Sequence, residues 1–229
     1  MSNLKNKRVI TAALCGSWAT KDMNPAVPYT PEEIARDAYE CWKAGAAIVH
    51  IHVRNADGSP STKFELYKET IERIRAFPDC DVCLNITSSG SVDFGDEERI
   101  YPLQQLLPEL ASYDAGTLNW QNRTVFMNPP AFLEKLGYAL QESNIKPEIE
   151  IFDAGMLGVA NYFVKKGHLP TPCHYQFCLG VLGGMPATVE NLLYLVQHIP
   201  AGSTWSAFGV GKGHLPILFA SLALGGHIR

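Results

Sequence analysis

Apolar and polar positions follow two recurring patterns along the chain, and these predict strands and helices in alternation. Short apolar runs that end in Gly, Ser or Asn predict buried strands, and segments with apolar residues every three or four positions predict amphipathic helices. The strands are predicted at residues 8–14, 46–53, 81–87, 112–118, 147–152, 174–179 and 203–208, with an eighth beginning at 227–229. The helices are predicted at residues 31–44, 65–77, 99–107, 130–144, 156–166, 188–197 and 214–223.

The helix at 31–44 has the clearest start signal. Thr30 is placed to cap it, Pro31 suits the first helical position, and Glu33 three residues after Thr30 completes a capping box. Gly45 suits the end of the helix, because glycine readily adopts the left-handed conformation there.

Seven strand–helix units and part of an eighth, without an antiparallel hairpin signal, predict a TIM (β/α)8 barrel. A doubly wound open sheet is the competing fold, but it concentrates its polar residues at one switch point. Here polar residues follow nearly every strand. No linker or low-complexity stretch divides residues 1–229, so we expect a single barrel domain that is cut short within strand eight.

Composition and charge narrow the function classes. The 229 residues are 46% hydrophobic, enough for one sizeable core, and the net charge of −4 gives no basic surface for nucleic acid or anionic membrane. The start of the chain is polar and no apolar run approaches the ~20 residues of a membrane span, so we expect a cytoplasmic protein. The six cysteines are expected to be free thiols.

The most informative motif is His50-Ile51-His52, which ends the predicted strand at 46–53. Residues two apart in a strand point to the same face, so the two imidazoles can bind one metal ion, as zinc sites with histidine ligands require. A pair of hydrogen-bonded histidines at a polar strand end is the alternative interpretation.

In a barrel, the carboxyl ends of the strands meet at one mouth, where residues distant in sequence become neighbours. The expected residues there are His50, His52, Arg54, Thr87, Ser88, Gly90, Asn119, Asp153 and the glycine loops 180–184 and 209–214. Gly211 and Lys212 lie in the second loop, just before a helix, where backbone N–H groups and the lysine can hold a phosphate. For Arg54 and Asp153, structural ion pairs are the alternative.

Motifs along essentially the whole chain resemble the β-keto acid cleavage enzymes. In order, they are Val9-Ile10-Thr11-Ala12-Ala13, Thr30-Pro31-Glu32-Glu33, Val49-His50-Ile51-His52-Val53-Arg54 with Asp57-Gly58, Ala115-Gly116-Thr117-Leu118-Asn119, Pro147-Glu148-Ile149-Glu150, Gln176-Phe177-Cys178-Leu179-Gly180, Gly183-Gly184-Met185, Thr204-Trp205-Ser206 and Gly225-Gly226-His227-Ile228-Arg229.

The resemblance implies a Zn²⁺-bearing TIM barrel that condenses a β-keto acid with acetyl-CoA to give acetoacetate and a shorter acyl-CoA. It also implies a homo-oligomer, for which the loop at 91–98 and the aromatic residues Tyr101 and Trp120 are candidate surfaces. It assigns His50 and His52 to the zinc ligands.

The same resemblance assigns Thr87 and Gly90, after strand three, and Ser112, in strand four, to substrate binding. Arg229 matches an arginine that pairs with a catalytic aspartate and helps to bind substrate. In the family a Glu-Asp pair follows this arginine and supplies the third zinc ligand and the base. We therefore expect the 229 residues to be an inactive fragment of a longer enzyme; a truncated, catalytically inactive relative is the alternative.

Trp18 stands where the family has an acidic residue that faces a substrate amine. The indole offers an apolar wall for an alkyl β-keto acid, or a cation–π face for a quaternary ammonium with help from Trp120, Phe94 and Asp96. Packing of the first loop is the structural alternative.

Two other functions compete with the cleavage reaction. One is a non-catalytic metal- or ligand-binding barrel, which needs only the two histidines and a pocket. The other is a zinc hydrolase of the amidohydrolase type, although that fold carries its HxH motif on strand one and this chain carries it on strand two.

Overall fold

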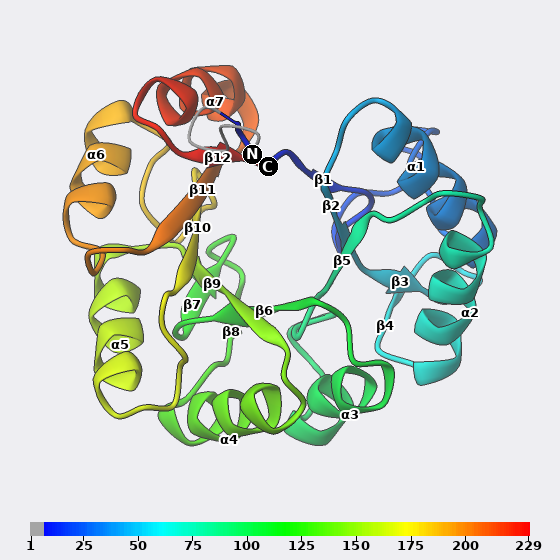
Figure 1. Cartoon of the computed structure of the whole chain (residues 1–229), viewed down its shortest axis with the longest axis horizontal. Helices are drawn as coiled ribbons and strands as arrows, with labels where there is room; N and C mark the ends of the chain where they lie inside the picture. Colours follow the sequence, from blue (N-terminus) through cyan, green and yellow to red (C-terminus); the bar gives the residue numbers. More distant parts are fainter. Residues whose placement is uncertain (1–6) are drawn as a thin grey trace. The chain divides into compact units, whose positions relative to one another are not determined.

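The computed structural model describes residues 7–229, and Figure 1 labels their helices and strands. These residues divide into two compact units. The first unit comprises Thr11–Asp114 and Pro130–Pro147. The second comprises Ala115–Pro129 and Glu148–Arg229, together with residues 7–10. Each unit is built from parallel strands connected by helices, and each is described below on its own.

The first unit contains four parallel strands in the order β1, β2, β5, β6. They span Thr11–Ala13, Ile48–Ile51, Cys83–Ile86 and Leu110–Asp114, and the helices α1, α2, α3 and α4 span Pro31–Lys43, Phe64–Arg75, Asp96–Leu106 and Pro130–Glu142. The core is apolar: Ile34 of α1, Val49 of β2 and Ile86 of β5 are fully buried. Helix α1 begins as predicted, because Thr30 and Glu33 form both halves of the capping box.

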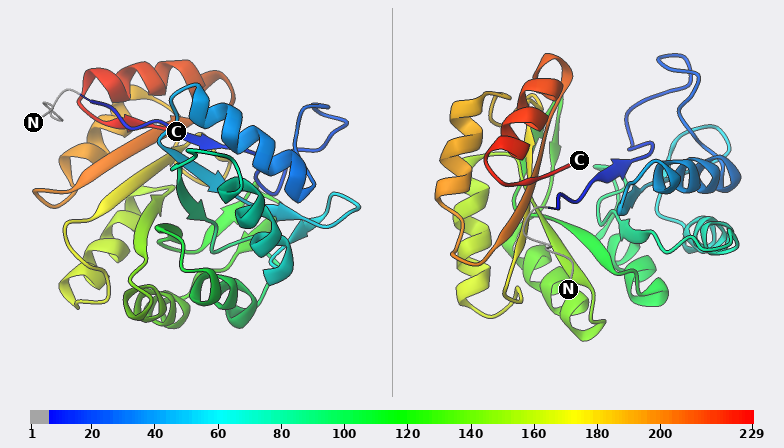
Figure 2. Two further views of the ribbon diagram at one scale, coloured as in Figure 1. Left: turned by 45° about the vertical axis from the view of Figure 1, so that its right-hand side comes forward. Right: turned by 45° about the horizontal axis from the view of Figure 1, so that its top comes forward.

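The second unit contains the parallel strands β9, β10, β11 and β12 in that order. They span Lys146–Ile151, His174–Leu179, Thr204–Gly209 and His227–Ile228, and helices α5, α6 and α7 span Ala154–Lys165, Val189–Gln197 and His214–Ala223. The three helices cover the same face of this sheet (Figure 2). Strand β12 pairs with β11, which confirms the predicted start of an eighth strand.

Strand β10 shows how side-chain alternation divides the second unit into two faces. The buried rings of Tyr175 and Phe177 alternate with His174, Gln176 and Cys178 along the strand. The Tyr175 hydroxyl donates a hydrogen bond to Asn161 of α5, so this series of side chains faces the helices. The intervening polar side chains therefore lie on the opposite face of the sheet.

Two short antiparallel hairpins correct the prediction that the chain has none. Strands β3 (Val53–Arg54) and β4 (Pro60–Ser61) pair in the first unit, and β7 (Leu118–Trp120) and β8 (Thr124–Phe126) pair in the second. The first turn uses Asp57-Gly58, with Gly58 at φ +83°. The second turn has Gln121 and Asn122 both at φ +54°, which is the backbone of a tight hairpin without glycine.

The succession of parallel strands and helices in chain order confirms the TIM (β/α)8 fold class. The single-domain organisation stays a prediction. All six cysteines are free thiols, as expected. Within residues 7–229, the helices are too short or too polar to cross a bilayer.

Candidate active site

Strand β2 brings the two predicted metal ligands together. His50 is its penultimate residue and is buried, and His52 follows the end of the strand. Their ring centroids lie 5.0 Å apart, whereas the intervening Ile51 is fully buried. Because the two imidazoles share one face of the strand, they are close enough to bind the same ion.

Cys15 lies beside this histidine pair and contacts its backbone. Its Sγ donates a hydrogen bond to the backbone carbonyl of His52 at 3.4 Å. Burial raises the pKa of the Cys15 thiol, and the positive charge of Arg54 offsets only part of that effect. The bond from the Cys15 thiol therefore supports the backbone at the end of β2.

A structural ion pair was the alternative considered for Arg54. Arg54 does have a structural role, but its partners are backbone carbonyls and not carboxylates. Its guanidinium donates to the carbonyls of Gly16, Gly58 and Ala19 at 2.8, 2.8 and 3.0 Å. It is 3% exposed, so these bonds fix the loop after β1 from inside. That loop carries Trp18, whose side chain is 52% exposed.

The loop at 87–90 gathers the residues predicted to bind substrate in the first unit. The backbone N–H of Ser88 donates to Ser112 Oγ at 2.9 Å, and Ser89 N–H donates to Thr87 Oγ1 at 3.0 Å. Gly90 has φ +63°, and a Cβ there would lie 2.6 Å from Thr62 Cγ2. This position therefore excludes larger residues.

Ser88 itself is a residue for which the sequence suggested no specific role. Its side chain is 1% exposed, and its hydroxyl has no hydrogen-bond partner among residues 7–229. Buried hydroxyls normally have a partner, so an unpaired one in this loop is suited to a bound polar molecule. The only sequence signal was its place at the end of a predicted strand.

Arg229 is held by two buried carboxylates in the second unit. Its Nη1 lies 2.9 Å from Glu148 Oε2 and 2.7 Å from Glu150 Oε1. Burial alone would lower the pKa of Arg229, but the charges of Glu150 and Glu148 outweigh it and raise the pKa. The arginine is therefore permanently charged, and its Nε is a buried donor without a hydrogen-bond partner in the described chain.

Polar side chains on β10 and β11 extend this cluster. Ser206 Oγ donates to Gln176 Oε1 at 2.6 Å and lies 3.2 Å from His174 Nε2, and His174 Nδ1 lies 2.8 Å from Thr204 Oγ1. The paired registers of β9, β10 and β11 place these residues in rows with Glu148 and Glu150. The sequence showed the residues but not their pairing.

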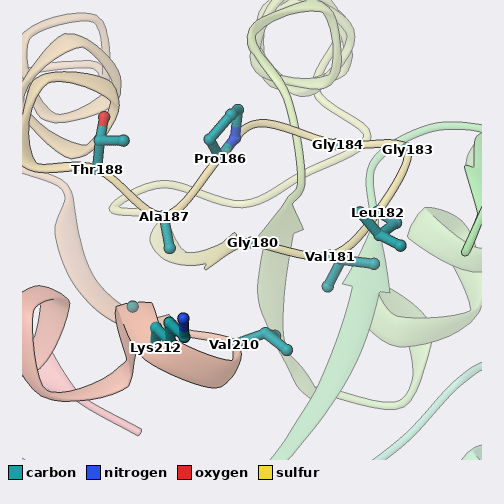
Figure 3. Close-up of a pocket in the computed structure, with 11 residues that line it drawn as sticks. Gly180, Val181, Leu182, Gly183, Gly184, Pro186, Ala187, Thr188, Val210 and Lys212 are labelled. Carbon is teal, nitrogen blue, oxygen red and sulfur yellow. The ribbon is translucent and has the colours of Figure 1, made fainter.

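A pocket of about 340 Å³ lies between the β10–α6 and β11–α7 loops (Figure 3). Residues 180–184 and 186–188 line it together with Val210, Lys212 and Gly213. The N-terminal ends of α6 and α7 border it, at Thr188 and Gly213. Lys212 therefore lies at the predicted place, whereas Gly211 adjoins the lining residues without belonging to them.

Asp153 and Asn119 were expected at the mouth, and Tyr101 and Trp120 on an exposed surface. Asp153 has a structural role, because it caps α5 by accepting the Met156 N–H at 2.9 Å. Asn119 is exposed on β7. Trp120 is not the exposed aromatic residue that was expected, because it is half-buried and packs edge-on against Phe126 and Phe152; Tyr101 is exposed, as predicted.

Comparisons with known proteins agree with the motifs. The model of the beta-keto acid cleavage enzyme family matches residues 7–229. The 3-keto-5-aminohexanoate cleavage enzyme of Fusobacterium nucleatum subsp. nucleatum is 42% identical over 99% of this chain, and the match covers 82% of that protein. The 3-dehydrocarnitine:acetyl-CoA trimethylamine transferase of Rhizobium meliloti is 33% identical over 96% of this chain and 80% of that protein.

A solved structure supports the fold separately. The apo structure of ObcA superposes with a TM-score of 0.80 over 90% of this chain, at 18% sequence identity, and the chain spans 55% of the ObcA chain. That likeness concerns the fold alone. The family match and the two relatives, together with the motifs, show that the chain belongs to the beta-keto acid cleavage enzyme family.

Proposed function

We propose that the full-length protein is a zinc-dependent enzyme that converts a β-keto acid and acetyl-CoA into acetoacetate and a new acyl-CoA. Family membership supports the reaction class, and the names of relatives such as the 3-oxoadipate:acetyl-CoA acetyltransferase of Cupriavidus necator support acetyl-CoA as the second substrate. The observation that carries the proposal is the pair of imidazoles, 5.0 Å apart, at the end of β2.

His50 and His52 fit a zinc ion as two of its protein ligands. Both are imidazoles on one face of a strand end, with ring centroids 5.0 Å apart. When bound, the ion would act as a Lewis acid that polarises the keto oxygen and stabilises the enolate.

Thr87, Gly90 and Ser112 are the proposed binding residues for the substrate carboxylate. A hydroxyl from Thr87 and the backbone N–H of Gly90 are donors that an anion prefers. Ser112 already accepts the N–H of Ser88, so its remaining donor capacity is its own O–H. The unpaired hydroxyl of Ser88 is a further donor in the same loop.

Arg229 is proposed to bind an anionic oxygen of the substrate in the second unit. Glu148 and Glu150 both bond to Nη1, which leaves the buried Nε as an available donor. The two carboxylates fix the guanidinium and keep it charged, so it can bind the anion without first changing its protonation state.

The pocket beside Lys212 is the proposed site for a phosphate of CoA. Glycine-rich loops let the backbone approach an anion closely, and helix N-termini carry partial positive charge. Figure 3 shows Lys212 on one side of this pocket, across from Ala187 and Pro186. Gly211, at φ +61°, shapes the loop that presents the lysine.

Lys212→Met is expected to raise the KM for acetyl-CoA about tenfold, because a charged hydrogen bond to phosphate contributes about 1.5 kcal/mol or more. The KM for the β-keto acid should change less than twofold. Steady-state kinetics of the zinc-loaded protein measure both constants, and Lys165→Met on α5 is the control for loss of a surface charge. Equal effects on the two constants would contradict the assignment.

Trp18 is proposed to select against a primary amine on the substrate, because it provides no negative charge. Alkyl 3-oxo acids should be turned over better than 3-keto-5-aminohexanoate, and Trp18→Glu should shift the preference toward the amine by about fivefold, as expected for a solvent-exposed ion pair. Dehydrocarnitine is the third substrate in the comparison.

The measurement is kcat/KM for the three substrates with the wild type and Trp18→Glu. Tyr101→Glu, at another exposed aromatic residue, controls for the added charge. A wild-type preference for the primary amine would refute the role of Trp18.

The reaction itself is tested by its requirement for acetyl-CoA. Zinc-loaded full-length protein should consume a 3-oxo acid only when acetyl-CoA is present and should release acetoacetate and the new thioester in equal amounts. Residues 1–229 alone should be essentially inactive. Consumption at full rate without acetyl-CoA would identify a hydrolase instead.

A further inference from the structure

Arg99, in the first turn of α3, is a buried cation that the proposed reaction does not yet use. Its side chain is 4% exposed, and Nε donates to the backbone carbonyl of Ser88 at 2.7 Å. Its Cζ lies 3.9 Å from the centroid of the Phe132 ring on α4. The guanidinium thus connects the 87–90 loop to a rigid aromatic platform.

The Ser88 main chain is consequently fixed from both sides. Ser112 on β6 accepts its N–H, and Arg99 on α3 donates to its carbonyl. Thr87 immediately precedes Ser88, and Gly90 follows two residues later. The directions of the Thr87 hydroxyl and the Gly90 N–H therefore depend on how the Ser88 main chain is held.

A buried charge is a costly way to anchor a loop, because the guanidinium loses its hydration. Burial lowers the pKa of Arg99, and the negative charges of Asp114 and Asp96 offset part of this effect. A neutral hydrogen-bond donor would anchor a carbonyl at lower cost. A cation next to the loop does something more, since it also attracts an anion bound there.

Arg75, on α2, provides a comparison with Arg99, because the two arginines bond to backbone carbonyls at opposite ends of β5. It donates from Nη1 to the carbonyl of Val82 at 2.7 Å, just before β5, and pairs with Glu109. Arg99 makes the same kind of bond just after β5 ends. In parallel β/α folds the carboxyl ends of strands carry function and the amino ends carry stability, so the two arginines separate these roles.

We propose that Arg99 is a positioning residue for the substrate carboxylate, acting by holding the Ser88 carbonyl so that the 87–90 loop presents its donors correctly. The proposal rests on the proposed function of Thr87 and Gly90. Small displacements of such groups are costly, since a shift of about 1 Å can reduce turnover by about a hundredfold.

The test compares Arg99→Met, Arg99→Lys and the control Arg75→Met in zinc-loaded protein. The probe is whichever of 3-oxohexanoate, 3-oxoadipate and dehydrocarnitine the wild type binds most tightly. Its Kd is measured by calorimetry without acetyl-CoA, and both KM values are measured by steady-state kinetics. Thermal unfolding reports stability for each variant.

Arg99→Met is expected to raise the Kd and KM for the 3-oxo acid about tenfold to a hundredfold, with the KM for acetyl-CoA within twofold of wild type. Arg99→Lys should recover part of the loss, because an ammonium keeps the charge and one donor. Arg75→Met should leave the Kd and KM for the 3-oxo acid and the KM for acetyl-CoA within twofold of wild type. This should hold even if its melting temperature falls as much as that of Arg99→Met. If Arg99→Met does not fold, Phe132→Leu removes the platform and should raise the same two constants.

The proposal is overturned if Arg99→Met, or Phe132→Leu in its place, loses stability while its Kd for the 3-oxo acid stays at the wild-type value. It is also overturned if Arg75→Met raises that Kd equally. Failure of the proposed reaction is separate: a wild type that binds the 3-oxo acid but forms no acyl-CoA would refute the activity, and the Kd values would still decide the role of Arg99.

Discussion

Alanine at either His50 or His52 is expected to reduce the zinc content of the purified full-length protein from about one ion per chain to less than about a tenth, because a catalytic zinc usually has only three protein ligands. Turnover should fall to background with it. The remaining histidine supplies only one ligand, and the nearby thiol of Cys15 is bonded to the His52 carbonyl. Elemental analysis after dialysis measures the content.

Thermal unfolding gives a second readout of the same binding. Zinc at a hundred times its Kd stabilises a folded protein by about 2.7 kcal/mol, so added zinc should raise the melting temperature of the wild type but not of the variants. His198→Ala is the control, since His198 is exposed at the end of α6 and bonds to the Tyr194 carbonyl. Stoichiometric zinc in a protein lacking both His50 and His52 would exclude this site.

Arg229→Met is expected to cost about 3–5 kcal/mol of the free energy of unfolding, because it leaves the buried carboxylates of Glu148 and Glu150 without their cation. Turnover should fall by about a thousandfold, as the loss of a preorganised charge in an active site does. Urea unfolding and kcat/KM measure the two effects.

A combined variant separates stability from catalysis. Adding Glu148→Gln and Glu150→Gln to Arg229→Met removes the unpaired charges, so most of the stability should return. Activity should not return, because the donor that binds the substrate is still absent. Recovery of turnover along with stability would show that Arg229 acts only through the fold.

The alternation of strands and helices could be predicted because apolar residues recur with a different period in each type of element. Strand β10 (His174–Leu179) and helix α7 (His214–Ala223) begin and end at the predicted residues, since glycines or prolines lie close to both. The hairpins could not be predicted as well. The turn at Gln121 and Asn122 places two non-glycine residues at positive φ, and such positions have a weak sequence signal.

In the candidate site too, arrangements within one strand could be predicted, whereas contacts between residues far apart in the sequence could not. His50 and His52 could be placed on one face because strand geometry fixes residues two apart. The pairing of Arg229 with Glu150 connects residues 79 positions apart, which no local pattern specifies. The contact between Arg99 and Ser88 likewise depends on how α3 returns to β5, and it became visible only with the fold.

The transfer of the acetyl group tests the central claim most directly. The zinc-loaded protein is incubated with an unlabelled 3-oxo acid and acetyl-CoA that carries ¹³C in both acetyl carbons, and the products are analysed by NMR and mass spectrometry. The proposed reaction places both labelled carbons at C3 and C4 of acetoacetate and leaves the new acyl-CoA unlabelled. Unlabelled free acids, formed while the acetyl-CoA remains intact, would contradict it.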